Sequence, residues 1–339
     1  MSKVFCFGEL LLRMSPQLQH QWIQKSSMPV YIGGAELNVA TALAKWNILV
    51  KYCTALPDHY LSHEIVQALK EKNIDTSPIL FSGNRIGTYY LPQGADLKNA
   101  GVIYDRAHSS FSELKTGVID WKKILQDCSW FHFSAISPAL NENIAVVCKE
   151  AIGVATSMGL TVSVDLNYRS KLWQYGKNPP VIMRELMKYC NVVMGNIWSV
   201  ENLLGIESPL KESKYKTKEE LLDAAGKSMK QIHLAYENVT TMAYTFRLEE
   251  IYYAVMQHGK EMVVSKEFPV TEKTDQAGSG DCFMGGLIYG FYNNYTERQI
   301  IDFAAAAAVG KLKERGDATN QTIDDVKRIM NTIWAETKI

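Results

Sequence analysis

An aspartate follows two glycines at the start of an apolar helical pattern in the segment DQAGSGD, residues 275–281. The small residues leave the backbone N–H groups there free to point at one spot, and a helix N-terminus adds about half a positive charge to that spot. This combination predicts an anion site formed by Gly278, Ser279 and Gly280. Asp281 lies in the first helical turn, where we expect its carboxylate to stay ionised and to accept the proton of a hydroxyl that attacks a phosphoryl group. The segment therefore predicts phosphoryl transfer. The plainer alternative is a glycine-rich N-cap with an ordinary capping aspartate.

Polar residues also follow other apolar runs that are typical of β-strands. Asp165 and Arg169 come after TVSV, and Asn196 comes after NVVMG. Ligands of an open parallel sheet bind beyond the carboxyl ends of its strands, so we expect these side chains close to the anion site.

The elements that position these residues alternate regularly along the chain. Short apolar runs such as VFCFGELL and LTVSVDLN are each followed by a helical pattern, here LNVATALAKW and PPVIMRELMKYC. This alternation predicts a doubly wound α/β fold, a mostly parallel sheet with helices on both faces. No linker or repeat interrupts the pattern, so we expect residues 1–339 to form a single domain. Two segments without helical period, about 14–34 and 87–110, predict a small antiparallel β-sheet lid.

Composition excludes several classes of partner. The chain has 36 Lys and Arg against 36 Asp and Glu, so no net field attracts nucleic acid or an anionic membrane, and a small molecule is expected instead. The 6 cysteines show no CxxC pair and no metal-ligand spacing, which is typical of reduced core residues in a cytoplasmic protein. The apolar N-terminus is interrupted by Glu9 and Arg13 and predicts a first β-strand, and no run approaches the ~20 apolar residues of a membrane span.

These motifs together resemble the ribokinase-like (PfkB) carbohydrate kinases. The resemblance rests on DxxGxGD at 275–281 and on GGAELNVATALA at 33–44, and it spans nearly the whole chain, most weakly between about 205 and 260. Within the family the chain is most similar to the 2-keto-3-deoxygluconate kinases in the segments GELLLRMSP, GTYY, YDR, DLNYRSKLW, GSGDCFMGGLIYG and ERGD. The resemblance implies a ribokinase-like core with a lid and phosphoryl transfer from ATP with Mg²⁺ to a sugar hydroxyl. It also implies Asp281 as the base and the amides of 278–280 as the anion hole.

The same resemblance implies a sugar-acid pocket. Its residues would be Gly34, Tyr89, Tyr104, Arg106 and Arg169, with Asp317 of ERGD as a further candidate. An independent argument points the same way, because the planar fork of a guanidinium group suits a carboxylate, whereas a neutral sugar is usually held by carboxylates and amides.

Each of these residues has a plainer alternative. The tyrosines would pack within the lid, Arg106 would lie on the surface, and Arg169 would cap a helix. The segment ERGDA would be an exposed turn. The Gly33-Gly34 pair is compatible with an ordinary strand-to-helix turn, although a backbone that a ligand approaches closely needs the same residues. Asn38, one helical turn further on, is left unassigned.

The chain also departs from the family pattern. Many members carry Asn-x-x-Glu where this chain has Asn196-Ile-Trp-Ser199, so the metal ligands are unknown and the magnesium ion is expected to rely on water and ATP oxygens. Asn196, Gly278 and Gly280 are the expected nucleotide contacts. The segment 232–253 replaces the usual Thr- and Gly-rich turn, so the adenine and ribose contacts are not assigned.

The sequence thus predicts an ATP-dependent kinase that phosphorylates the terminal hydroxyl of 2-keto-3-deoxygluconate or a close sugar acid. One alternative is a kinase of a neutral ketose such as fructose. An alternative of another class is a catalytically silent sugar-binding regulatory protein, which Ser199 and the segment 232–253 suggest. A Rossmann dehydrogenase is excluded because no GxGxxG follows the first strand. The lid strands predict a homodimer or a higher homo-oligomer.

Overall fold

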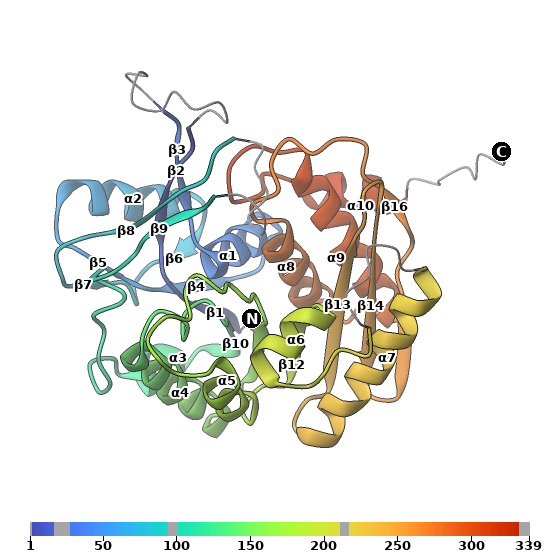
Figure 1. Cartoon of the computed structure of the whole chain (residues 1–339). Coiled ribbons are helices and arrows are strands. Elements are labelled where there is room, and N and C mark those ends of the chain that lie inside the picture. Colours follow the sequence, from blue (N-terminus) through green and yellow to red (C-terminus); the bar gives the residue numbers. More distant parts are fainter. Residues whose placement is uncertain (1, 17–27, 94–100, 211–216, 332–339) are drawn as a thin grey trace.

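A large, mostly parallel β-sheet forms the centre of the computed structural model, which describes residues 2–16, 28–93, 101–210 and 217–331 (Figure 1). Within these residues the sheet has ten strands in the order β15-β14-β13-β12-β11-β10-β1-β4-β6, and β16 pairs with β14. Pairings from β13 to β6 are parallel, and those of β14 are antiparallel. The strands are β1 (Lys3–Phe7), β4 (Val50–Cys53), β6 (Ile74–Asp75), β10 (Cys128–Ser134), β11 (Thr161–Asp165), β12 (Val192–Gly195), β13 (Thr241–Arg247), β14 (Ile251–His258), β15 (Glu261–Val264) and β16 (Phe268–Pro269).

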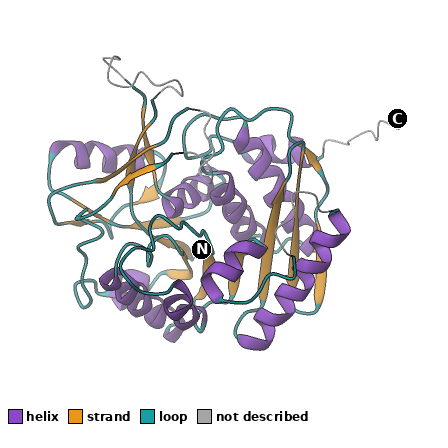
Figure 2. Cartoon of the chain, in the orientation of Figure 1, coloured by secondary structure: helices purple, strands orange, loops and turns teal. Residues whose placement is uncertain are grey.

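Helices cover both faces of this sheet (Figure 2). One face packs against α1 (Ala35–Lys45), α2 (Tyr60–Glu71), α8 (Ser279–Tyr292), α9 (Glu297–Leu312) and α10 (Ile323–Met330). The other packs against α3 (Trp121–Leu125), α4 (Glu142–Ser157), α5 (Pro179–Met187), α6 (Ile197–Leu204) and α7 (Lys218–Ala235). The predicted doubly wound α/β fold is therefore confirmed.

The strand sequences explain the two cores. In β1, Val4 and Cys6 point into the core on the α8 side, and Phe5 and Phe7 point into the core on the α4 side. Successive side chains of a strand alternate between faces, so a strand covered on both faces must be apolar throughout. The N-terminal segment is thus a central strand, as predicted.

The predicted lid is a separate four-stranded sheet in the order β3-β2-β8-β9. Its strands are β2 (Leu11–Met14), β3 (Val30–Gly33), β8 (Gly87–Tyr90) and β9 (Ile103–Asp105). The outer pairings, β2 with β3 and β8 with β9, are antiparallel, whereas the central pairing of β2 with β8 is parallel. The lid begins at residue 11 rather than 14, and 17–27 and 94–100 of the predicted ranges lie outside the described residues. A further small sheet pairs β5 (Ala55–Leu56) with β7 (Leu80–Phe81).

The glycines of α8 are explained by packing against its neighbours. A Cβ atom on Gly286 would lie 2.6 Å from the Cα atom of Ala304 in α9, and one on Gly290 would lie 2.8 Å from Ile300. On another side, a Cβ atom on Gly285 would lie 3.2 Å from Ala42 in α1. These contacts fix the helix that carries the predicted anion site between α1 and α9.

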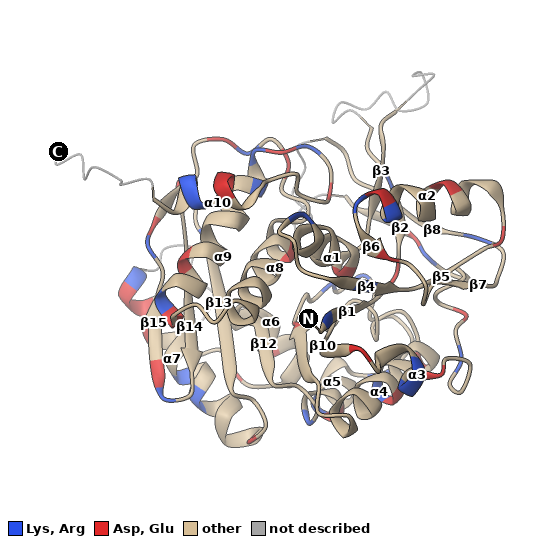
Figure 3. Cartoon of the chain, turned by 180° about the vertical axis from the view of Figure 1, so that it is seen from behind, with Lys and Arg blue, Asp and Glu red and all other residues tan. Residues whose placement is uncertain are grey.

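Positively and negatively charged residues are interspersed along the outer helices (Figure 3), as expected from the balanced composition. The six cysteines lie within the described residues, and all of them are free thiols. Within the described ranges, no helix is long and apolar enough to cross a membrane.

Candidate active site

A cleft of about 920 Å³ lies at the carboxyl ends of the parallel strands, beside the lid. Strand order reverses between β1 and β10, which is the place where open α/β sheets bind ligands. The cleft is lined by residues that follow or end β1, β11, β12 and β13, namely Glu9, Asp165, Asn196 and Arg247. It is also lined by the turn before α8, so the polar residues predicted to gather after the strands do meet.

The segment 278–281 begins helix α8 at the floor of this cleft. Gly278 is the N-cap, with a φ of 77°, and a Cβ atom there would lie 1.8 Å from the carbonyl oxygen of Asp317, so only glycine fits. The first N–H groups of a helix have no partner within it, and those of Gly278, Ser279 and Gly280 line the cleft. The hydroxyl of Ser279 donates to the carbonyl of Ala308 (3.0 Å) and packs inward, which leaves its amide for a ligand.

Asp281 lies in the first turn of α8 and is 8% exposed. Its Oδ2 accepts a hydrogen bond from Nδ2 of Asn38 in α1 (2.7 Å). Burial raises the pKa of Asp281 to about 7, while Asn38 and, more weakly, Arg169 act to lower it. Burial therefore opposes the expected ionisation of this carboxylate, because desolvation disfavours its charged form. A carboxyl group with this pKa is suited to general base catalysis near neutral pH.

Arg106 and Arg169 both line the cleft, but their surroundings differ. Nε and Nη2 of the buried Arg106 each lie 2.6 Å from Oε2 of Glu9, whose other oxygen accepts from Ser109. Arg169 donates to the carbonyl of Tyr168 (3.0 Å), and within the described part of the chain it forms no ion pair. The predicted pair of guanidinium groups is thus present in the cleft, with one of them already neutralised by a carboxylate.

Tyr89, Tyr104 and Asp317 also line the cleft. The rings of the two tyrosines lie 6.3 Å apart on neighbouring lid strands. The Tyr89 hydroxyl donates to Oδ2 of Asp317 (2.6 Å), and Oδ1 of Asp317 accepts from Nη1 of Arg13 (2.5 Å). Asp317 is 3% exposed, so ERGD is not the exposed turn that was the alternative, and both carboxylate oxygens of Asp317 accept from protein groups. Its role in binding the substrate stays a prediction.

Gly34 is the N-cap of α1 and lines the cleft. Its φ is 133°, and a Cβ atom there would lie 2.3 Å from the carbonyl oxygen of Glu9. Glycine is therefore needed for the backbone turn itself, in addition to any approach of a ligand.

Asn196, one of the expected nucleotide contacts, also lines the cleft. Its Oδ1 accepts from the amide of Ser199 (2.9 Å), and the Ser199 hydroxyl accepts from the Asn196 amide (3.0 Å), a capping box that starts α6. The unassigned segment 232–253 contains the end of α7, strand β13 and the start of β14, and it contributes Thr245, Phe246, Arg247, Leu248 and Tyr252 to the cleft.

Several cleft residues were missed by sequence reasoning. Glu9 was read only as a charge in a strand, and Asn38 was noted without a role. Glu36 is fully buried, with its Oε1 accepting from the amide and hydroxyl of Ser134 (2.9 and 2.7 Å), and burial raises its pKa. The spacing of Gly34, Glu36 and Asn38 around one helical turn was the available signal, because a helix that starts at a strand end presents its first turn to the ligand.

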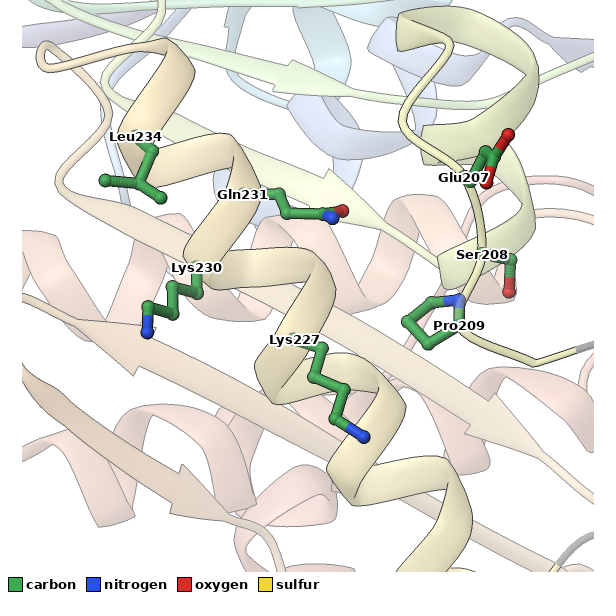
Figure 4. Close-up of a pocket in the computed structure, with 7 residues that line it drawn as sticks. All are labelled: Glu207, Ser208, Pro209, Lys227, Lys230, Gln231 and Leu234. Carbon is green, nitrogen blue, oxygen red and sulfur yellow. The ribbon is translucent and has the colours of Figure 1, made fainter.

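Within the described ranges, no group of three His, Cys, Asp or Glu side chains could hold a metal ion. A second hollow, of about 430 Å³, lies between α7 and the segment that follows α6 (Figure 4). It is lined by the segment after α6 and the outer face of α7, namely Glu207, Ser208, Pro209, Lys227, Lys230, Gln231 and Leu234. Lys227 forms an ion pair with Asp223 (2.7 Å), and nothing in the hollow resembles a catalytic group.

A doubly wound sheet with a lid over an anion-binding helix N-terminus and a buried aspartate defines a small-molecule phosphotransferase. The pfkB family of carbohydrate kinases matches residues 1–324, and the chain belongs to this family.

Known relatives agree with this assignment. The chain is 27% identical to a 2-dehydro-3-deoxygalactonokinase of Haloferax volcanii, over 97% of this chain and 96% of that one. It resembles the crystal structure of a 2-dehydro-3-deoxygluconokinase of Thermotoga maritima, with a TM-score of 0.88 and 33% identity over 98% of this chain and 100% of that one. A fructokinase of Xylella fastidiosa with bound ATP shares the fold, with a TM-score of 0.77 and 19% identity over 97% and 98% of the two chains.

Proposed function

We propose that this chain is an ATP-dependent kinase that phosphorylates the terminal hydroxyl of 2-keto-3-deoxygluconate or of a close sugar acid, such as its galactose-derived epimer. The observation that carries the proposal is the position of Asp281 in the first turn of α8, in one cleft with Arg169 and Arg106. The names of the Haloferax and Thermotoga relatives support a 2-keto-3-deoxy sugar acid as the substrate.

In this mechanism the sugar acid binds beneath the lid, with its carboxylate against Arg169 and the remaining N–H groups of Arg106. Asp281 accepts the proton of the terminal hydroxyl as that oxygen attacks the γ-phosphorus of ATP. The bond from the γ-phosphorus to the β,γ-bridging oxygen breaks, and ADP leaves. The amides of 278–280 and the positive end of α8 stabilise the charge on the transferred phosphoryl group.

ATP is proposed to enter as its magnesium complex. The donor set around the cleft lacks a preformed cage in the described residues, and Ser199 stands where many relatives carry a glutamate. Magnesium usually keeps several waters and is held by substrate phosphates, so this arrangement fits a metal ion that arrives with the nucleotide. Asn196 and the cleft residues between 245 and 252 are proposed to contact that nucleotide, because they line the same cleft as Asp281.

A neutral ketose such as fructose is the second candidate, and the Glu9–Arg106 ion pair favours it, because that pair cancels one of the two positive charges. Arg169, which forms no ion pair with any residue that the structure describes, favours the sugar acid. A silent sugar-binding protein has no use for a buried aspartate at an anion hole.

The test is ATP turnover, followed by a coupled ADP assay, with 2-keto-3-deoxygluconate, its galactose-derived epimer, gluconate, fructose and ribose. Selective turnover of the keto-deoxy acids is expected. Turnover of fructose alone would remove the carboxylate-binding role of Arg169, and ATP binding without any turnover would favour the silent protein.

We also propose that residues 1–339 form one kinase domain, since strands between residues 3 and 269 share one sheet. Exposed apolar residues on the outer lid strands, Val30 and Ile103 (each 52% exposed), support a homodimer formed through the lid. Light scattering of the purified chain tests this, with Val30→Glu expected to give monomers. The free thiols support a reducing compartment, the cytoplasm.

A further inference from the structure

A buried cluster of charged side chains lies behind the cleft. It consists of Arg13, Asp275, Lys311 and Asp317, hereafter the Arg13 cluster. Arg13 is 1% exposed, and its Nη2 and Nη1 lie 2.6 Å from Asp275 and 2.5 Å from Asp317. Within the described part of the chain, the residues that line the cleft include Asp317 but not Arg13. Arg13 therefore acts on a ligand only through other residues.

On one side the cluster holds the turn that leads into the anion hole. Oδ1 of Asp275 accepts from the amide of Ala277 (3.1 Å), which directly precedes Gly278. Oδ2 of Asp275 accepts from the amide of Gly316 (3.2 Å), whose carbonyl oxygen in turn accepts from Nζ of the fully buried Lys311 (2.8 Å). The turn before α8 and the loop after α9 are thus tied together.

On the other side the cluster holds the lid. Arg13 itself belongs to lid strand β2, and Asp317 accepts from Tyr89 of lid strand β8. A Cβ atom on Gly33, at the end of lid strand β3, would lie 2.0 Å from Oδ2 of Asp317. Three of the four lid strands therefore reach the carboxylate of Asp317, and the backbone carbonyl oxygen of the same residue lies against Gly278.

The stability of the fold does not by itself explain why the Arg13 cluster is buried. A buried ion pair often contributes less than well-packed apolar residues of the same volume, because desolvation offsets much of the attraction. Although burial alone would lower the pKa of Arg13, Asp317 and Asp275 raise it, so the guanidinium stays charged. Its two arms reach carboxylates that lie 262 and 304 residues away along the chain, and a single ammonium group has no such fork.

We propose that Arg13 is a positioning residue that fixes the lid relative to the anion hole, so that the sugar pocket and the phosphoryl site keep one geometry. This inference rests on the proposed function. A small displacement of the reacting groups strongly lowers the rate of phosphoryl transfer. A lid that does not close fully admits water, which can accept the phosphoryl group in place of the sugar.

The test compares Arg13→Lys and Arg13→Met with Lys51→Met. Lys51 is a matched control, because it is also buried and forms an ion pair with Asp127 (2.5 Å). It lies in the first half of β4, toward the amino ends of the parallel strands, whereas the cleft lies at their carboxyl ends. All variants are compared by kcat, by KM for sugar and for ATP, by thermal unfolding, and by ATP hydrolysis per sugar phosphorylated.

Arg13→Lys is expected to fold, to lose roughly 10- to 100-fold in kcat, and to hydrolyse more ATP per sugar phosphorylated than the wild type. Lys51→Met is expected to lose stability with little change in either activity. Arg13→Lys serves as the decisive variant if Arg13→Met does not fold. The proposal is overturned if Arg13→Lys keeps wild-type kcat and coupling, or if its kcat falls only in proportion to its folded fraction.

The sugar used is whichever one the wild type phosphorylates, so a wrong substrate assignment leaves this test intact. If no sugar is accepted, ATP affinity and sugar-free hydrolysis are compared instead. Under the proposal, the ATP affinity and the rate of sugar-free hydrolysis both differ from the wild type in Arg13→Lys and equal the wild type in Lys51→Met. Equal values in the wild type, Arg13→Lys and Lys51→Met would refute the proposal.

Discussion

Replacing Asp281 with asparagine is expected to stabilise the folded protein above pH 7. The pKa of Asp281 is about 7 in the folded chain, raised chiefly by burial, against the ordinary value of 3.8 for an exposed aspartate. A raised carboxyl pKa means that the native state binds the proton more tightly than the unfolded state. The contribution of this tighter proton binding to the free energy of unfolding is therefore fully present below about pH 4, declines with rising pH, and is lost above about pH 7.

The size of the effect follows from the same shift. A difference of about 3 pKa units corresponds to about 4 kcal/mol at about 1.4 kcal/mol per unit, which is an upper bound. Asparagine carries no charge, and its side-chain oxygen can still accept from Nδ2 of Asn38. The free energy of unfolding of the variant should therefore exceed that of the wild type by up to about 4 kcal/mol at pH 8 and by much less at pH 4.

Urea unfolding of both proteins at pH 4, 6 and 8 measures this difference, and comparing the two proteins at each pH cancels the titration of the other buried carboxyl groups. A stability difference that is the same at all three pH values would refute the assignment of a raised pKa to Asp281.

Three further predictions follow from the site and its packing. The kcat/KM of the wild type should rise as the pH increases through about 7, because Asp281 loses its proton there, and below pH 7 it should rise about tenfold per pH unit. A kcat/KM that is constant from pH 5 to 8 would contradict the role of Asp281 as the base. Arg169→Ala should raise KM for the sugar acid about 10- to 100-fold and leave KM for ATP nearly unchanged, and equal changes would exclude a carboxylate-binding role. Gly286→Ala should cost about 1–3 kcal/mol in urea unfolding, because the new Cβ atom meets the backbone of Ala304. Gly285→Ala is the milder control and should cost less, because its Cβ atom would meet side-chain atoms of Ala42 (3.2 Å) and Trp46 (3.4 Å), whereas that of Gly286→Ala would lie 2.6 Å from a backbone atom.

The architecture was predictable because it depends on local patterns. Apolar strands such as TVSVD alternate with amphipathic helices, and this pattern determines a doubly wound sheet and places the polar residues after each strand at one edge. The position of Gly278 and Asp281 at a helix N-terminus was predictable for the same reason, since both lie within one short segment.

Contacts between distant segments were not predictable. The parallel pairing of β2 with β8 joins strands that are separated by more than 70 residues, and nothing in either strand specifies its direction. The pKa of Asp281 depends on α1 covering it, and the neutralisation of Arg106 depends on Glu9, which lies 97 residues away. Asp317 was read from a local turn, whereas its partners come from the lid.

The most direct test of the central claim is to measure turnover and binding of the same substrates by wild type and Asp281→Asn. Isothermal titration gives the affinity for ATP and for 2-keto-3-deoxygluconate, and the coupled assay gives kcat. We expect kcat to fall about 10²- to 10⁴-fold, with both affinities close to wild type, because the variant keeps the cleft and the anion hole and loses only the base. Turnover within a few fold of the wild type would contradict Asp281 as the catalytic base, and with it the account of this cleft as the site of phosphoryl transfer.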